Sequence, residues 1–246
     1  MGSPATPRRP LSVAAAQPAC VGYDLAANAA AHAAAVRAAG ARVVVFPELS
    51  LTGYELDAAA VELDDPRLGP IVEACAETGS VALAGGPVLG DDGRRHLGML
   101  AIDAAGVRVV YRKTFLGGAE PDHFAPGPGA EEIEVDGWRL GLGICKDTRI
   151  AEHITTTGAL GIDAYAAGML EAAEDAGVPE ERARRIAREL GIPVVIASFA
   201  GSTGGGYDVA AGGSGIWAAD GTELARAGAE VGEVVRATLG LRSAGP

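Results

Sequence analysis

Short apolar runs alternate with capped, alanine-rich segments along most of this sequence, and this alternation limits the fold class more than any other feature. Leu11–Ala16 and Val43–Phe46 read as strands because each is short, continuous and apolar or β-branched. Between them, Leu25–Ala39 predicts a helix that is capped by Asp24 and closed by Gly40. Strands that alternate with helices favour a layered α/β domain.

Predicted hairpins interrupt this alternation, so some neighbouring strands must be antiparallel. With about eleven or twelve strands and about four helices, the pattern favours mixed sheets with helices outside over a purely parallel sheet. The further predicted strands are Val81–Ala84, Leu97–Ile102, Val107–Arg112, Ile133–Val135, Trp138–Ile144, Ala164–Ala167, Pro193–Ser198, Ser214–Ala218, Glu223–Arg226 and Val231–Ala237. The further predicted helices are Pro66–Thr78, a weak one at Ile150–Leu160, and Pro179–Leu190.

Composition predicts one domain, at residues 11–240, behind a flexible leader at residues 1–10. The chain has 246 residues, of which 48% are hydrophobic, enough for a sizeable core. Its net charge of −12 argues against a nucleic-acid binder, which would need a basic face. No run approaches the roughly 20 apolar residues of a membrane span.

The cysteines and histidines match no metal or redox motif. The three cysteines have no C-x-x-C spacing, and the four histidines make no H-E-x-x-H pattern. An odd, sparse cysteine count is typical of a reducing compartment, so we expect a cytoplasmic protein.

Three reactive residues follow three of the predicted strands. Glu48 comes after Val43–Phe46, Lys113 after Val107–Arg112, and Cys145 directly after Ile144. In layered α/β folds, sites form at the edge where strands end, so these side chains are expected to meet at one edge of one sheet. A carboxylate, an ammonium and a thiol in contact are the parts of a cysteine nucleophile with its own base and oxyanion partner.

Each of these residues also has an ordinary interpretation. A glutamate after a strand is usually a solvated loop residue, and a lone lysine at a strand end is most often a surface charge. A free cysteine is most often a small buried hydrophobe, and Cys20 and Cys75 are assigned to packing. Cys145 differs because Lys146 and Arg149 follow it, and a cysteine beside cations tends to have a lowered pKa. Glu48 is followed by apolar residues, so partial desolvation is expected to raise its pKa and suit it to proton transfer.

Three segments in this order resemble the signatures of the carbon–nitrogen hydrolase (nitrilase-like) superfamily. They are Phe46–Tyr54, Tyr111–Thr114 and Gly143–Arg149. Further agreement comes from Glu120 with the Phe124, Pro126 and Gly127 that follow it, from residues 182–198, and from residues 213–221. The resemblance extends from about Leu11 to Arg236.

The resemblance implies a four-layer α-β-β-α sandwich with two mixed β-sheets, whose subunits pair through outer helices into a homodimer or higher homo-oligomer. It also implies roles: Glu48 as general base, Lys113 as oxyanion stabiliser, Cys145 as nucleophile, and Glu120 as the glutamate that positions the lysine and substrate. The Lys146 backbone N–H is a further oxyanion donor, and Tyr54 is a candidate substrate contact.

The implied reaction is hydrolysis of a small linear carboxamide through a cysteine thioester, with no metal or organic cofactor. A nitrilase or a carbamoyl-group hydrolase would use the same residues. A catalytically inactive binding or assembly module is the alternative from another class, although the four intact polar residues argue against it.

Several positions around the expected pocket depart from the family pattern. Lys146 stands where an aromatic residue is usual, Ile150–Glu152 replace an aromatic-Pro-Glu sequence, and Gly117 and Gly118 replace bulkier residues. Either the Lys146 side chain recognises a substrate carboxylate, or it points to solvent while only its N–H is used.

Overall fold

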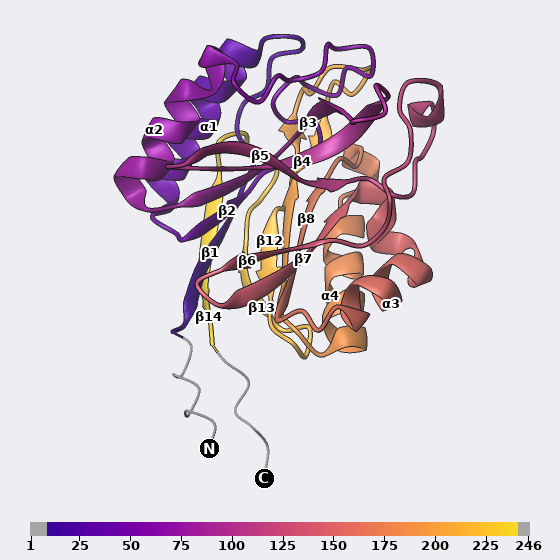
Figure 1. Ribbon diagram of the computed structural model, residues 1–246. Helices are drawn as coiled ribbons and strands as arrows, with labels where there is room; N and C mark the ends of the chain where they lie inside the picture. Colours follow the sequence, from indigo (N-terminus) through magenta and orange to yellow (C-terminus); the bar gives the residue numbers. More distant parts are fainter. Residues whose placement is uncertain (1–8, 241–246) are drawn as a thin grey trace, which may run out of the picture.

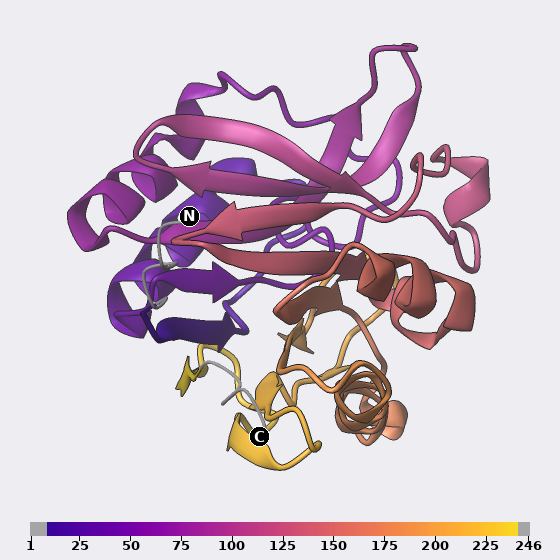
Figure 2. The same cartoon turned by 60° about the horizontal axis from the view of Figure 1, so that its bottom comes forward.

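The computed structural model describes residues 9–240 as two six-stranded sheets packed face to face, with helices on both outer faces (Figures 1 and 2). Helices α1 (Leu25–Ala39) and α2 (Gly69–Thr78) cover the first sheet, and α3 (Ala151–Ala159) and α4 (Val178–Leu190) cover the second. The predicted four-layer α-β-β-α sandwich is therefore confirmed. The predicted leader lies at residues 1–10, and residues 1–8 of it fall outside the described part.

Both sheets mix parallel and antiparallel pairs, as predicted. The first sheet has the order β14-β1-β2-β3-β4-β5 and the second the order β13-β12-β9-β8-β7-β6, while β10 (Ala200–Gly201) and β11 (Ala210–Ala211) form a small separate pair. The first sheet contains β1 (Leu11–Ala16), β2 (Val43–Val45), β3 (Val81–Leu89), β4 (Arg95–Asp103), β5 (Gly106–Arg112) and β14 (Val234–Leu239). The second contains β6 (Glu132–Val135), β7 (Trp138–Ile144), β8 (Ala164–Met169), β9 (Val194–Ser198), β12 (Gly215–Trp217) and β13 (Glu223–Arg226).

Alternate side chains along a strand pack into two different hydrophobic cores, one between the sheets and one under the outer helices. In β1, Leu11 and Val13 pack between the two sheets, whereas Ala14 and Ala16 pack under the outer helices. This is the period of two that a strand buried on both faces requires. Small residues on the helix side let α1 approach the sheet closely, which explains why an alanine-rich sequence with few aromatics can fill this core.

Strands β3 and β8 run further than the sequence predicted. Strand β3 continues through Gly85, Gly86 and Pro87 to Leu89, and β8 continues to Met169. Glycine and proline weaken a strand prediction because they usually mark turns. In β3 the glycines are tolerated because antiparallel pairing with β4 holds this segment along its length.

The ends of the strands bring the predicted reactive residues to the same side of the sandwich. Strands β2 and β3 are parallel, and two antiparallel steps through β4 give β5 the same direction, so Glu48 and Lys113 leave the first sheet at one edge. Cys145 follows β7, which belongs to the second sheet. The expectation of one edge of one sheet was therefore wrong, because the site forms between two facing sheets.

Two glycines, one from each sheet, make room for the segment that carries Glu48. A Cβ atom at Gly85 of β3 would lie 2.4 Å from the backbone nitrogen of Leu49. A Cβ atom at Gly168 of β8 would lie 2.6 Å from the carbonyl oxygen of Phe46 and 2.9 Å from the backbone nitrogen of Glu48. Both contacts are with backbone, which cannot swing aside as a long side chain can.

We therefore expect Gly168→Ala to displace the Glu48 segment. The substitution should lower the free energy of unfolding by about 1–3 kcal/mol, the usual range for overpacking, and should also reduce catalytic activity. Gly69→Ala is the matched control, since a Cβ atom there would meet no atom within 4 Å. Urea unfolding of both variants is the measurement, and equal stability of the two would contradict the steric argument.

No helix within residues 9–240 is long and apolar enough to cross a membrane.

Candidate active site

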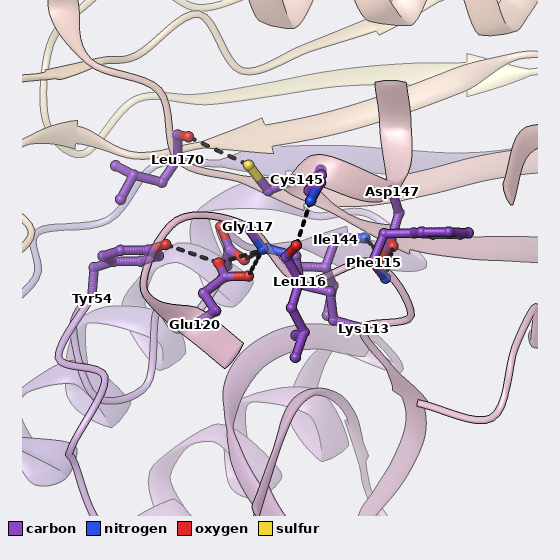
Figure 3. A network of polar contacts seen from close by, with 12 residues as sticks. Tyr54, Lys113, Phe115, Leu116, Gly117, Glu120, Ile144, Cys145, Asp147 and Leu170 are labelled. Carbon is purple, nitrogen blue, oxygen red and sulfur yellow. Dashed lines mark hydrogen bonds and ion pairs between the residues drawn. The ribbon is translucent and has the colours of Figure 1, made fainter. Parts of the chain in front are cut away.

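A buried ion cluster lies where the first sheet ends. The Lys113 ammonium contacts Glu48 Oε1 at 2.6 Å and Glu120 Oε1 at 2.7 Å, and all three side chains are at most 2% exposed. Tyr54 donates its hydroxyl to Glu120 Oε1 at 2.9 Å, and the backbone N–H of Gly117 donates to Glu120 Oε2 at 2.8 Å (Figure 3). The structure thus brings together four of the residues predicted from the sequence.

Cys145 occupies a sharp turn at the end of β7. Its φ of 40° lies in the left-handed region, which costs a non-glycine residue about 1–3 kcal/mol, so the surrounding contacts must hold it there. The turn continues as a 3-10 helix, η3 (Cys145–Arg149), in which Thr148 donates its hydroxyl to the carbonyl of Cys145. The thiol contacts the carbonyl oxygen of Leu170 at 3.6 Å (Figure 3).

Asp147 ties this cysteine turn to the segment that carries Lys113. One of its carboxylate oxygens accepts the N–H of Ile144 at 3.0 Å and the hydroxyl of Tyr111 at 2.8 Å, and the other accepts the N–H of Phe115 at 2.9 Å (Figure 3). Asp147 is fully buried, so these hydrogen bonds are shielded from water. The carboxylate therefore fixes the cysteine turn relative to the lysine strand.

Lys113, Glu120 and Cys145 line one cavity of about 400 Å³, together with Tyr54 and Lys146. Glu48 is buried and contacts the Lys113 ammonium, but it is not among the residues that line this cavity. One oxygen of Glu48, Oε2, has no hydrogen-bond partner among residues 9–240 although it is buried. A carboxylate with an open acceptor, held next to a cation, is able to receive a proton.

Burial controls the ionisation of this cluster. It raises the pKa of Glu48, as the sequence predicted, with Lys113 acting in the opposite direction and Glu120 adding to the rise. Burial alone would lower the pKa of Lys113, but the charges of Glu48, Cys145 and Glu120 outweigh burial, so the Lys113 pKa lies above its ordinary value. The lysine is therefore charged at neutral pH and can stabilise negative charge in the cavity.

The predicted lowering of the Cys145 pKa was wrong. Burial is the largest influence, and together with the charge of Glu48 it raises the pKa of Cys145 to about 12, although Lys113 opposes the rise. The cations that follow in sequence do not reverse this effect; Lys146 instead donates its ammonium to the carbonyl of Leu116. The thiol is thus protonated at rest, and a base must remove its proton before it can attack.

Of the two alternatives predicted for the Lys146 side chain, the structure argues against the one in which it points to solvent, and recognition of a carboxylate stays a prediction. The side chain lies in the cavity wall, hydrogen-bonded to Leu116, so it does not point to solvent. Tyr54 also lines the cavity, and burial with the nearby charges of Glu48 and Glu120 raises its pKa, so its hydroxyl stays protonated.

Sequence reasoning missed a fourth strand end at the site. Leu170 and Glu171 follow β8, which is parallel to β7, and both line the cavity. Glu171 Oε1 lies 3.9 Å from the Cys145 sulfur and 2.7 Å from Arg182. The sequence predicts a strand that ends at Ala167 and therefore does not place these two residues at a strand end, although the observed β8 ends directly before them.

No group of three or more His, Cys, Asp or Glu side chains in the described residues could hold a metal ion.

Residues 12–246, nearly the whole chain, match the sequence pattern of the carbon–nitrogen hydrolase family. The protein therefore belongs to the carbon–nitrogen hydrolase family. Solved structures agree with this fold. An amidase from Nesterenkonia AN1 superposes with a TM-score of 0.81 at 24% identity over 93% of this chain and 90% of its own. Nit3 of Saccharomyces cerevisiae, from the nitrilase superfamily, gives a TM-score of 0.82 at 21% identity over 94% and 90% of the two chains.

Two relatives in Pseudomonas match over a shorter range. A protein of Pseudomonas protegens, described as a hydrolase in the pqqF 5' region, is 34% identical over 131 residues, which are 50% of this chain and 46% of its own length. An (R)-stereoselective amidase of a Pseudomonas species is 28% identical over 135 residues, which are 54% of this chain and 49% of its own. The match thus spans about half the length of either relative.

Proposed function

We propose that this protein is an amidase, which hydrolyses a small linear carboxamide to ammonia and a carboxylic acid through a thioester on Cys145. The observation that carries the proposal is the buried Glu48–Lys113–Glu120 cluster, with Lys113 and Glu120 facing the same cavity as a strained cysteine turn. Burying three charged groups is costly, so an arrangement of this kind is typical of a site that uses them.

In the first half of the reaction, Glu48 takes the proton of the thiol and the sulfur attacks the amide carbon. The Cys145 side chain, which contacts Leu170 at rest, must turn toward Glu48 for this transfer. The Lys113 ammonium and the backbone N–H of Lys146 stabilise the oxyanion, and a single donor of this type is worth about 3–4 kcal/mol. The C–N bond then breaks, Glu48 returns the proton to nitrogen, and ammonia leaves a thioester.

In the second half, water replaces ammonia at the same position. Glu48 takes a proton from water, the resulting hydroxide attacks the thioester carbon, and the same donors stabilise the second oxyanion. The C–S bond breaks, the sulfur regains its proton from Glu48, and the acid leaves. A raised Glu48 pKa suits both directions of transfer, because the group must accept and donate a proton in each cycle.

Two of the similar proteins support an amide over a nitrile as the substrate. One relative is an (R)-stereoselective amidase. In one glutamate mutant of the Nesterenkonia amidase acrylamide adds to the active-site cysteine, and in another mutant the acetamide moiety of fluoroacetamide adds there. Ammonia release from a nitrile or from a ureido acid would instead indicate a nitrilase or a carbamoyl-group hydrolase. The pairing of subunits into a homodimer or higher homo-oligomer stays a prediction.

The proposal is tested by acrylamide labelling combined with an ammonia-release screen over amides, nitriles and ureido acids. We expect the adduct on Cys145 well before Cys20 or Cys75, since Cys145 lines the cavity and has a neighbouring base, while burial raises the pKa of all three thiols. Ammonia release is expected from amides. Equal labelling of the three thiols, with no ammonia from any compound, would instead favour an inactive binding module.

A further inference from the structure

The cavity has two chemically different parts. Its base carries the Cys145 thiol and Lys113, which pairs with Glu120 in the cavity and with the buried Glu48. Its outer wall carries three cations, Lys146, Arg149 and Arg182, but only one carboxylate, Glu171. The wall therefore carries two more cations than carboxylates, although Glu171 interacts with both Arg182 and Arg149.

This excess runs against the composition of the chain. The net charge is −12, so a positive cavity wall is not part of a generally basic surface. Lys113 and Lys146 are also the only lysines in the sequence, every other basic residue apart from histidine being arginine, and both line this cavity. A chain that uses arginine almost everywhere thus places both of its lysines at one site.

The hydrogen-bonding capacity of the wall is only partly used. Arg182 pairs with Glu171 at 2.7 Å, and the Lys146 ammonium donates to the carbonyl of Leu116, which leaves further N–H donors on that ammonium. Arg149 makes no hydrogen bond or ion pair with any residue in the range 9–240 that would occupy its guanidinium. A planar guanidinium presents five donors in a fork that fits a carboxylate.

The position of Arg149 relative to the nucleophile is fixed by the backbone. Both residues belong to the short helix η3, which Asp147 anchors to β7 and to the segment after β5. Gly117 and Gly118 line the same cavity, and a Cβ atom at Gly117 would lie 3.3 Å from the Lys146 side chain. The glycines therefore keep open the space beside Lys146.

We propose that Lys146 and Arg149 bind a carboxylate of the substrate, so that this enzyme acts on amides that carry a second, anionic group. This inference rests on the proposed amidase function. The carboxylate would balance the excess charge of the wall while the amide carbon lies at Cys145. Substrates of this class are the monoamides of short dicarboxylic acids.

The test compares succinamic acid, the monoamide of succinic acid, with butyramide, a neutral amide of the same chain length. The wild-type kcat/KM should be higher for succinamic acid. Arg149→Gln should lower that value roughly 10- to 100-fold, mainly through KM, and leave butyramide nearly unchanged, as expected for loss of a charged hydrogen-bonded pair. Arg94→Gln is the matched control, because it makes the same charge change at an exposed arginine that pairs with Asp92.

Lys146→Met provides a second variant that keeps the apolar stem and the backbone N–H. It should also weaken succinamic acid selectively. Equal effects of Arg149→Gln and Lys146→Met on both amides would overturn the inference while leaving the amidase proposal in place.

If no amide is hydrolysed, measuring the binding of succinamic acid still tests the carboxylate site separately from the amidase proposal. Calorimetry with Cys145→Ala should detect succinamic acid, and Cys145→Ala/Arg149→Gln should bind it at least 10-fold more weakly. If no amide is hydrolysed but this difference is found, the amidase proposal fails and the carboxylate site stands. If the two variants bind succinamic acid equally, the carboxylate site is refuted.

Discussion

Replacing Cys145 with alanine is expected to reduce ammonia release by roughly a millionfold, because the variant has no atom that can form the thioester. Glu48, Lys113 and Glu120 would remain, but they act on the nucleophile and the oxyanion and cannot replace the sulfur. The fold should persist, since the side chain is only partly buried and alanine fills most of its space. Steady-state ammonia release and the thermal unfolding midpoint are the two measurements.

Cys20→Ala is the control for this experiment. Cys20 is also partly buried, and it packs against the apolar group of Leu170, Phe199 and Ala210, but it does not itself line the cavity. We expect Cys20→Ala to keep nearly all of the activity. Substantial ammonia release by Cys145→Ala would exclude a cysteine mechanism.

Replacing Lys113 with methionine should have the largest effect on stability as well as abolishing activity. Methionine keeps the volume of the stem but leaves Glu48 and Glu120 buried without their cation. Removal of one partner from a buried ion pair costs about 3–5 kcal/mol, because a buried charge is left uncompensated. Activity should fall too, since the oxyanion loses its ammonium.

The destabilisation by Lys113→Met should depend on pH in a defined direction. Burial raises the pKa of Glu48 and Lys113 opposes that rise, so the variant's Glu48 pKa should lie further above the ordinary value of about 4.3. The folded state then binds more protons than the unfolded state at neutral pH, and stability must decrease as pH rises from about 5 to 8.

Urea unfolding of the wild type and Lys113→Met at pH 5.5 and pH 8 measures this dependence. The difference in unfolding free energy between the two proteins should be larger at pH 8. The double variant Lys113→Met/Glu48→Gln removes one of the uncompensated charges, so it should regain part of the stability at pH 8 but none of the activity. A loss below about 1 kcal/mol at both pH values would contradict a buried ion cluster at this position.

The sequence was sufficient to locate most of the site because strand ends are readable from hydrophobic runs. Glu48, Lys113 and Cys145 each follow such a run, and the structure places Lys113 against Glu48 and in one cavity with Cys145. The rule failed for Glu171 because small residues and a glycine near the end of β8 hid the last part of that strand. A local pattern cannot show whether pairing with neighbours extends a strand.

Other features depend on distances through space, which a linear pattern does not contain. The site lies between two sheets because these pack face to face, with β2 against β8 and β9, and nothing local to any of these strands specifies this. Likewise, the sequence neighbours of Cys145 predicted a lowered pKa, whereas burial and the charge of Glu48, 97 positions away, raise it. Gly168 lies just past the end of the predicted strand, and its role is evident only from the backbone of Glu48 that lies against it.

The central claim is that the sulfur of Cys145 becomes covalently bonded to the acyl group of the substrate. Acid quenching within the first turnovers, followed by peptide mass spectrometry, tests it directly with an amide that the ammonia screen identifies. We predict an acyl group on the peptide that contains Cys145, removable by hydroxylamine and missing from Cys145→Ala. Steady release of ammonia with no acylated cysteine, or with the acyl group on Cys20 or Cys75, would contradict it.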